Sequence, residues 1–276
     1  MNRSKKNRQM LVHAIIEYIE KNLHEKLTIH VISQYSGYTK WYLQKLFSFE
    51  TKIPLASYIR KRKLSNAALE LKITNNRIID IALKYGFESQ QSFSRTFKEN
   101  FRLSPFQYRH SSYFELYNYT VPYADISENY LVTAKLVYFR GVKQLSGRMD
   151  KFNIEPSLIA MNQLELRLNE VERSNDFDGM VIVYEKQKGF NEKILANVFY
   201  FSSHEEGSID INLDYDMYIE VKLDYQSKNN NLYTVIDAVK RYSIHSNVKL
   251  IANSAMIKCY NRQDRIVKYY LPVQEV

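Results

Sequence analysis

The chain has 276 residues, which suits two domains of ordinary size, and 45% of its residues are apolar, so a core can form. No apolar run approaches the ~20 residues of a membrane-spanning helix, and no apolar segment of signal-peptide type follows the basic N-terminus. The single cysteine, Cys259, excludes an internal disulfide framework and a multi-cysteine metal site, and we expect a cytoplasmic protein.

Charge is divided unevenly along the chain. Residues 1–112 carry 20 Lys and Arg against 8 Asp and Glu, a net charge of +12, whereas residues 113–276 carry 19 against 22, a net charge of −3. A basic part joined to a mildly acidic part indicates a polyanionic partner for the first part alone. The alternative is that the basic surface only keeps that domain soluble.

The first part of the chain has the apolar spacing of helices, with apolar residues recurring at intervals of three and four. Thr28 and Thr39 are placed to cap helices, Pro54 separates two of them, and Ser104 with Pro105 starts the last. The predicted helices cover residues 10–23, 29–35, 40–50, 55–73, 77–85 and 89–101, with a short one after Ser104.

Two segments repeat one pattern of a short helix, a glycine turn and a second helix. The first is Ile29–Glu50 and the second is Ile78–Glu99, and an aromatic residue follows each turn glycine, Gly37 and Gly86. Helix, tight glycine turn and helix is the arrangement that presents a recognition helix to the DNA major groove. The glycines are 49 residues apart, whereas the matching apolar residues of the second helices are 50 apart, so the second turn is one residue longer.

Polar side chains occupy the outward face of the second helix in each pair. Arg95 can donate two hydrogen bonds to guanine, glutamine can pair with adenine, and Trp41 offers an apolar face to thymine methyl groups. The alternative, above all for Lys40 and Lys98, is an ordinary solvated helix face. The candidate DNA-binding residues are Lys40, Trp41, Gln44 and Lys45 in the first pair, and Gln90, Gln91, Ser94, Arg95 and Lys98 in the second.

The helix predicted over Leu55–Ile73 connects the two pairs. Its 19 residues span about 28 Å, close to the ~34 Å between adjacent major-groove entries on one face of DNA. One polypeptide can therefore reach two successive grooves without dimerising. Its basic run from Arg60 to Lys63 is predicted to contact phosphates, with a solvated basic patch as the alternative.

After residue 130, strand and helix patterns alternate. The order strand, helix, strand, strand occurs twice, which predicts two βαββ units in one antiparallel sheet, with two helices on one face and a ligand-sized groove between the halves. The predicted strands are residues 132–142, 180–184, 194–201, 217–225, 249–259 and 266–273, and the predicted helices are residues 156–171 and 232–243.

Four motifs occur in family order: SGYTKWYLQKLF (36–47), YIRKRKL (58–64), YGFESQQSFSRTFK (85–98) and SPFQYR (104–109). Through them, the segment from Ala14 to Arg109 resembles the AraC/XylS family of transcription regulators, and within it the subgroup of MarA, SoxS and Rob. The resemblance implies a monomeric seven-helix DNA-binding domain whose two outward faces read successive grooves. It also implies contact with RNA polymerase and activation of multidrug-resistance and stress promoters. Lys45 stands where the subgroup usually has arginine, so the guanidinium fork is missing there.

The second part, from Val132 to Val276, resembles a GyrI-like effector-binding domain of Rob type, through its element order and its closing strand KYYLPV (268–273). Such domains often bind apolar or cationic molecules, using a glutamate at the position where this chain has Lys268. The resemblance therefore implies a small apolar or amphiphilic effector. The candidate effector-binding residues are the tyrosines Tyr138, Tyr184, Tyr218 and Tyr269, for which packing in the core is the alternative, and the carboxylates Glu185 and Asp224.

We therefore expect an α+β multidomain protein with an all-α DNA-binding domain carrying two helix-turn-helix motifs over residues 1–111, a Tyr-rich linker over 112–130 and an effector-binding domain over 131–276. The expected partners are double-stranded DNA, bound as a monomer, RNA polymerase and an effector, but no membrane. The alternative is that the C-terminal domain is a protein-interaction or sequestration module that binds no small molecule. We expect no enzyme activity, cofactor or metal, because the six histidines lack metal-ligand spacing and the chain has no phosphate loop or Gly-x-Ser-x-Gly turn.

Overall fold

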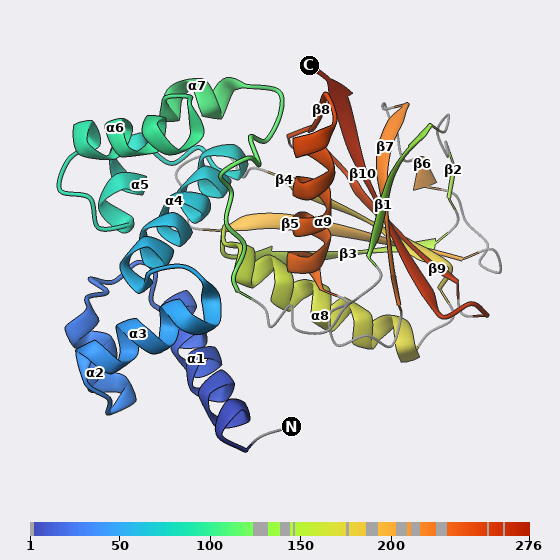
Figure 1. Cartoon of the computed structure of the whole chain (residues 1–276). Helices are drawn as coiled ribbons and strands as arrows, with labels where there is room; N and C mark the ends of the chain where they lie inside the picture. The colour runs from blue at the N-terminus through green and yellow to red at the C-terminus, as the bar shows by residue number, and fades with distance from the viewer. Residues whose placement is uncertain are drawn as a thin grey trace.

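The computed structural model describes residues 3–123, 132–138, 144–145, 147–174, 177–185, 193–202, 209–210, 216–224, 231–252, 254–261 and 263–276. Its N-terminal region is helical, and its C-terminal region is an antiparallel sheet with two helices (Figure 1). The helices of the N-terminal region are α1 (Arg3–Lys21), α2 (Ile29–Ser36), α3 (Lys40–Thr51), α4 (Leu55–Ile73), α5 (Ile78–Lys84), α6 (Gln90–Phe101) and α7 (Pro105–His110).

Helix α4 is the centre of the helical region, with α1 to α3 around its first half and α5 to α7 around its second half (Figure 1). Its bounds agree with the prediction, because Pro54 precedes it and Thr74 ends it. Every residue from Leu64 to Ile73 is buried, including Glu70 and Lys72. A surface helix buries only one stripe, so burial on all sides means that a second layer covers the face that α5 to α7 leave open. That layer is the C-terminal region.

The C-terminal region contains one large sheet in the strand order β1-β7-β10-β9-β4-β5-β3, with β8 paired to β10, and β2 pairs with β6 separately. All of the described pairings are antiparallel. The elements are β1 (Thr133–Tyr138), β2 (Gln144–Leu145), β3 (Gly147–Ile154), α8 (Leu158–Ser174), β4 (Gly179–Glu185), β5 (Ile194–Phe201), β6 (Ile209–Asp210), β7 (Met217–Asp224), α9 (Leu232–His245), β8 (Val248–Leu250), β9 (Met256–Asn261) and β10 (Ile266–Glu275).

Two strand predictions need correction. The sequence analysis missed β3, because Gly147–Ile154 is a half-exposed strand at the end of the sheet order with charged residues and no clear apolar alternation. The single strand predicted over 249–259 is wrong, because the chain leaves β8 after Leu250 and enters β9 only at Met256. The strand predicted over 132–142 corresponds to β1, and its residues 139–142 lie outside the described part of the chain.

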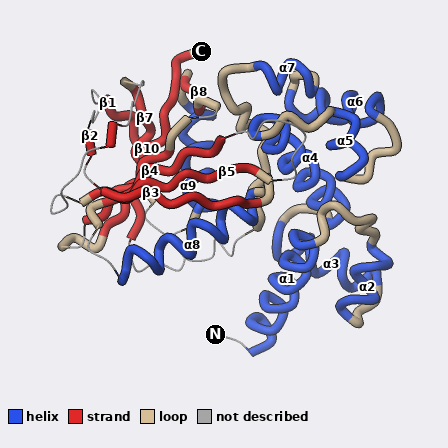
Figure 2. The backbone as a smooth tube through the Cα atoms, turned by 180° about the vertical axis from the view of Figure 1, so that it is seen from behind, coloured by secondary structure: helices blue, strands red, loops and turns tan. Residues whose placement is uncertain are grey.

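Helices α8 and α9 cover one face of the large sheet (Figure 2). Ile219, Val221 and Leu223 of β7 belong to the core on that face. Tyr218 belongs to a smaller cluster with Val181, Phe199 and Ile257. Because successive side chains of a strand point to opposite faces, this smaller cluster lies on the other side of the sheet.

One hydrophobic core runs through both regions. It contains the second half of α4, buried residues of α5 to α7, and the side chains that α8, α9 and the sheet turn toward one another. The residues of α1 to α3, together with the first turns of α4, form a separate core. The second helix group is therefore packed as part of the same core as the sheet, whereas the first group is packed independently of it.

Residues 111–123, here called the strap, run between the two regions and contact both. Leu116 and Tyr119 are buried in the shared core. Lys72 Nζ donates to the Ser111 carbonyl oxygen at 2.5 Å, and Lys240 Nζ of α9 donates to the Tyr119 carbonyl oxygen at 2.7 Å. Within the region predicted as a linker, residues 112–123 are thus packed, and residues 124–130 lie outside the described chain.

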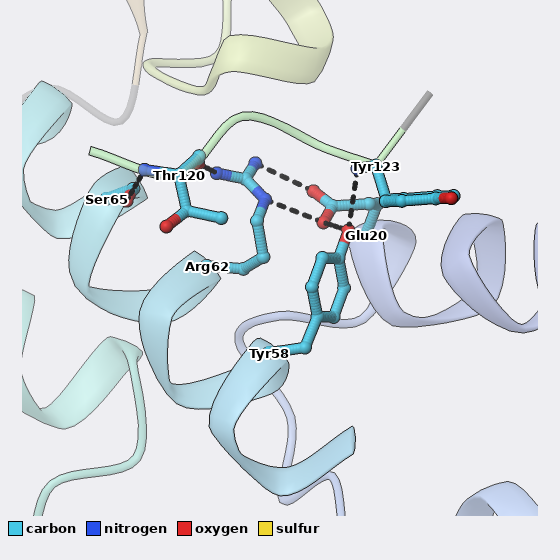
Figure 3. A network of polar contacts seen from close by, with 6 residues as sticks. All are labelled: Glu20, Tyr58, Arg62, Ser65, Thr120 and Tyr123. Atoms are coloured by element: carbon cyan, nitrogen blue, oxygen red, sulfur yellow. Dashed lines mark hydrogen bonds and ion pairs between the residues drawn. The ribbon is translucent and has the colours of Figure 1, made fainter. Parts of the chain in front are cut away.

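A buried polar network fixes the strap to α1 and α4 (Figure 3). Arg62 and Glu20 form an ion pair whose side chains are 0% and 6% exposed. Arg62 Nη1 also donates to the Thr120 carbonyl oxygen, and the Thr120 amide donates to Ser65 Oγ at 2.9 Å. The Tyr123 amide donates to Tyr58 Oη at 3.2 Å. Backbone groups of the strap therefore form hydrogen bonds at both ends of this network, Thr120 beside Arg62 and Tyr123 beside Tyr58.

Candidate nucleic-acid interface

The first helix pair, α2 and α3, is joined by Gly37. The Thr28 side chain caps α2 by accepting from the Val31 amide at 3.3 Å. Gly37 ends the helix with φ +74°, a left-handed conformation that residues with a Cβ adopt only at a cost, and its amide donates to the Ser33 carbonyl oxygen. Thr39 then caps α3. The predicted caps and turn are confirmed at these positions.

The second helix pair, α5 and α6, has the same construction with a longer turn. Gly86 has φ +79°, and Ser89 caps α6 by accepting from the Ser92 amide at 3.2 Å. Two residues separate Gly37 from the start of α3 at Lys40, and three separate Gly86 from the start of α6 at Gln90. The extra residue predicted in the second turn is thus present after the glycine.

Helices α3 and α6 match position for position. Each has 12 residues, and each residue of α6 is numbered 50 higher than its counterpart in α3. Leu43 and Phe47 are buried, as are their counterparts Phe93 and Phe97. The two helices lie near opposite ends of α4 (Figure 1).

The outward faces of α3 and α6 carry the predicted DNA-binding side chains. Trp41 is 68% exposed, and Lys45 Nζ lies 5.0 Å from the centre of its ring system. Arg95 Nε lies 3.2 Å from Glu99 Oε1, and both side chains are largely exposed, so the guanidinium group remains accessible. Ser94 is half-buried. The exposed members of the set are Lys40, Trp41, Gln44, Lys45, Gln90, Gln91, Arg95 and Lys98.

The basic run in α4 is only partly a surface feature. Arg60 and Lys61 are exposed, as a phosphate contact requires. Arg62 is fully buried against Glu20, and Lys63 Nζ donates to the carbonyl oxygens of Glu25 and Tyr85. The prediction that the whole run contacts phosphates is wrong for Arg62, because its position on the helix turns it toward α1 and the strap.

The helical region has well-defined relatives. The protein-family model described as a helix-turn-helix domain matches residues 32–111. The transposon Tn10 TetD protein of Escherichia coli is 48% identical over 102 residues, which are 37% of this chain and 74% of TetD. The transcriptional activator AarP of Providencia stuartii is 48% identical over 99 residues, 36% of this chain and 73% of AarP. The multiple antibiotic resistance protein MarA of Salmonella typhimurium is 46% identical over 98 residues, 36% of this chain and 77% of MarA.

The chain belongs to the AraC/XylS family of transcription regulators. Within the family it is MarA-like, and residues 32–111 match its helix-turn-helix domain. The identity to these three relatives covers just over a third of the chain.

The candidate effector-binding residues of this AraC-type regulator do not share one site. Tyr184 and Tyr269 lie on the face of the sheet that α8 and α9 cover, and Tyr269 Oη donates to Glu165 Oε1 of α8 at 2.9 Å. Tyr218 is buried on the opposite face. Tyr138, 68% exposed, ends β1. The predicted carboxylates, Glu185 and Asp224, are exposed at strand ends.

The sequence analysis missed a buried carboxylate beside Lys268. Glu220 of β7 accepts a hydrogen bond from Tyr270 Oη at 3.0 Å and pairs with Lys135 at 3.3 Å and Lys268 at 3.7 Å. Burial opposes its ionisation, but the hydrogen bonds from Tyr270 and Lys135 hold the pKa of this carboxyl below its usual range. The alternation Tyr218, Glu220, Lys222 in β7 was the signal that could have placed this carboxylate on the face of Tyr218.

A second buried charge lies on the helix-covered face. Lys258 of β9 is 0% exposed and donates to Glu165 and Asn169 of α8, which fixes α8 on the sheet. Among the described residues no group of three or more His, Cys, Asp or Glu is placed to hold a metal ion. Within the same residues no helix is long and apolar enough to cross a membrane.

Proposed function

We propose that this chain activates transcription by placing α3 and α6 in two successive major grooves of one DNA duplex. The observation that carries the proposal is the position-for-position match of the two helices, each beginning after a positive-φ glycine turn and each exposing the same four positions, Lys40/Gln90, Trp41/Gln91, Lys45/Arg95 and Phe49/Glu99. The net charge of +12 over residues 1–112 supports binding to a polyanion.

Each outward face has a defined role in this proposal. Arg95 reads guanine with its guanidinium fork, while Gln44, Gln90 and Gln91 read adenine and Trp41 contacts thymine methyl groups. Lys45 contributes a single charge to guanine or phosphate, and Ser94 a short hydroxyl contact. Lys40, Arg60 and Lys98 contact phosphates and set the register of the protein on the duplex.

The names of two relatives support a proposal for the target promoters, and the family resemblance implies the second protein partner. MarA is a multiple antibiotic resistance protein and AarP is a transcriptional activator. We infer that this chain activates promoters of multidrug-resistance or stress genes and contacts RNA polymerase there as a monomer.

We infer further that the C-terminal region is a GyrI-like pair of βαββ units that controls the DNA-binding region. In the first unit β5 lies between β3 and β4, and in the second β10 lies between β7 and β9, so the two units pair alike and meet at β4 and β9. The shared core and the strap supply the physical connection through which this region could act on α4.

Selection of bound sequences from a random DNA pool tests the two-groove proposal. The full chain is used, because removing the C-terminal region would expose the buried second half of α4. Wild type should select a site with two recognisable halves about one helical turn apart. Trp41→Ala should relax base preference in one half and Arg95→Ala in the other, each by about 1–3 kcal/mol per lost contact.

Lys21→Ala serves as the control, since Lys21 is exposed on α1 and has no role in the proposal. It should select the same site as wild type. If Trp41→Ala and Arg95→Ala relaxed the same base positions, or if neither relaxed any, the two-groove assignment would be overturned.

A further inference from the structure

An apolar cavity of about 110 Å³ lies where the second half of α4 meets the C-terminal region. Leu69 and Ile73 of α4 form one wall, and α9 contributes Leu232 and Ile236. The strap contributes Leu116 and Tyr119. None of the described lining residues is charged. A cavity of similar size and composition, ~150 Å³ lined by Leu, Ile and Phe, stays dry and binds benzene.

The cavity lies on the other side of the sheet from the position where the family resemblance expects the ligand-binding glutamate, and one of the candidate effector-binding tyrosines, Tyr184, lines it. That resemblance points to the position of Lys268, which shares a sheet face with Glu220 and Tyr270. The cavity is lined by Leu271, which belongs to the core on the other face. Residues three apart in a strand point to opposite sides, so the two places are separated by the sheet itself.

We propose that this cavity binds an uncharged apolar molecule about the size of a substituted benzene ring, and that its occupancy alters DNA binding through α4. The inference rests on the proposed function and adds a ligand class and a route of control. A carboxylate or ammonium group would enter the cavity without a charged partner, and an unpaired buried charge is strongly unfavourable. An uncharged ring loses only its contact with water and gains the contacts that the walls offer.

The route of control follows from what surrounds α4. Leu69 and Ile73 face the cavity, while Ala67, Ala68 and Leu71 belong to the same buried core as Phe93 and Phe97 of α6. A ligand that presses on the cavity wall therefore presses on the helix that positions the second recognition helix. Since Leu116 and Tyr119 close the cavity from the strap, the same ligand also acts on the segment that holds Arg62.

When two sites are coupled in this way, the effect of each ligand on the affinity of the other must be the same. If the apolar molecule changes the DNA dissociation constant by a given factor, DNA must change the dissociation constant of that molecule by the same factor. Coupling of this kind is typically about 5- to 150-fold. The second half of the DNA site, read by α6, should carry the change, because α1 to α3 have a core of their own.

The test uses toluene as the probe, with benzoate and benzylammonium as charged molecules of the same ring. Thermal unfolding of the full chain should shift upward with toluene concentration and should not shift with either charged molecule. The dissociation constant for the selected DNA duplex, measured by fluorescence anisotropy, should change at least about 5-fold at saturating toluene.

Two variants locate the effect. Ile236→Trp fills the cavity from α9, where Ile236 is half-buried, and should abolish both the thermal shift and the change in DNA affinity. Ile244→Trp, on the same helix but outside the cavity lining, should keep both. Leu69→Ala removes side-chain atoms from the cavity wall on α4 and should weaken toluene binding through the lost contacts. Leu64→Ala, in the same core but outside the cavity lining, should leave toluene binding unchanged.

Several results would overturn the inference. They are the absence of a toluene shift in wild type, a shift that survives in Ile236→Trp, binding of benzylammonium in place of toluene, and a shift without any change in DNA affinity. All of these are separate from failure of the proposed function, which would show as a chain that selects no sequence from the DNA pool whether or not toluene is present.

Discussion

Arg62 of α4 and Glu20 of α1 form a buried two-point ion pair, with Nε 2.7 Å from Oε1 and Nη2 2.8 Å from Oε2. Tyr58 Oη donates to the same carboxylate at 3.0 Å, and the strap supplies the Thr120 carbonyl oxygen to Arg62. Removing one partner of such a pair leaves an uncompensated charge in the core. The pair therefore connects the first helix group, α4 and the strap.

Glu20→Gln should lower the free energy of unfolding by about 3–5 kcal/mol, because it leaves the Arg62 guanidinium group buried without its counter-charge. Urea unfolding followed by circular dichroism measures the change. The double variant Glu20→Leu/Arg62→Met should be less destabilised than Glu20→Gln alone, since it removes both charges together. Lys61→Gln, at the exposed neighbouring position, should change stability by no more than about 0.5 kcal/mol. A loss in Glu20→Gln as small as that in Lys61→Gln would contradict the role given to the pair.

The DNA-binding region was largely predictable from local signals. Pro54 and Thr74 bound α4, threonine and serine cap the recognition helices, and the two glycines have the positive φ that their turns need. These features depend on a few adjacent residues, so the sequence carries them directly.

The features that the sequence analysis did not predict depend on contacts between residues that are far apart in the sequence. Arg62 belongs to a run of four basic residues, and only its helical spacing from Tyr58 and Ile59 distinguishes it from Arg60, yet one is buried and the other is exposed. The alternation in β7 places Glu220 on the face of Tyr218, but its partners Lys135 and Lys268 come beside it only through the pairing of β7 with β1 and β10. The strap has no period of its own because its contacts alternate between the helical region and α9.

Gly37→Ala should destabilise the first helix pair by about 1–2 kcal/mol, the cost of a left-handed conformation for a residue with a Cβ. A Cβ at Gly37 would meet nothing within 4 Å, so the cost is conformational and not steric. Asparagine adopts this conformation more readily, so Gly37→Asn should be less destabilised than Gly37→Ala. Chemical unfolding of the two variants beside wild type checks the order, and equal stability of Gly37→Ala and wild type would contradict it.

The salt dependence of DNA affinity should distinguish residues that contact bases from residues that contact phosphates. Arg60→Ala should weaken binding to all sequences alike and reduce the slope of log K against log salt by about 0.9, because one phosphate contact is lost. Arg95→Lys keeps the charge but loses the planar fork, so it should keep the slope and lose discrimination at one guanine by about 1–3 kcal/mol. Fluorescence anisotropy with the selected duplex and a variant of it, over a salt series, measures both quantities.

The matched control for that experiment is Lys151→Ala, at an exposed lysine on β3 of the C-terminal sheet that has no role in the proposed interface. It should change neither slope nor discrimination. An Arg60→Ala protein with the wild-type slope would remove Arg60 from the interface, and an Arg95→Lys protein with full discrimination would remove Arg95 from base reading.

Buried tyrosines should make the protein unstable in alkali. Burial raises the pKa of Tyr119 to about 12, and it raises the pKa values of Tyr58, Tyr85 and Tyr108 well above the ordinary value near 10. Between pH ~10 and the folded pKa, the unfolded chain has lost protons that the folded chain keeps, so unfolding becomes more favourable as pH rises. Each such group can lower the free energy of unfolding by up to about 1.4 kcal/mol per pH unit in that window, and has no effect below pH ~9.

Guanidinium unfolding at several pH values between about 8 and 11 measures this loss, and the ultraviolet absorbance of tyrosinate reports ionisation in the same samples. The buried tyrosines Tyr58, Tyr85, Tyr108 and Tyr119 should ionise together with the loss of helical circular dichroism. Tyr119→Phe removes one buried hydroxyl and should reduce the alkaline loss relative to wild type, whereas Tyr117→Phe at the exposed position should not. A single tyrosine titration complete before any loss of structure would show that these hydroxyls are not protected by the shared core.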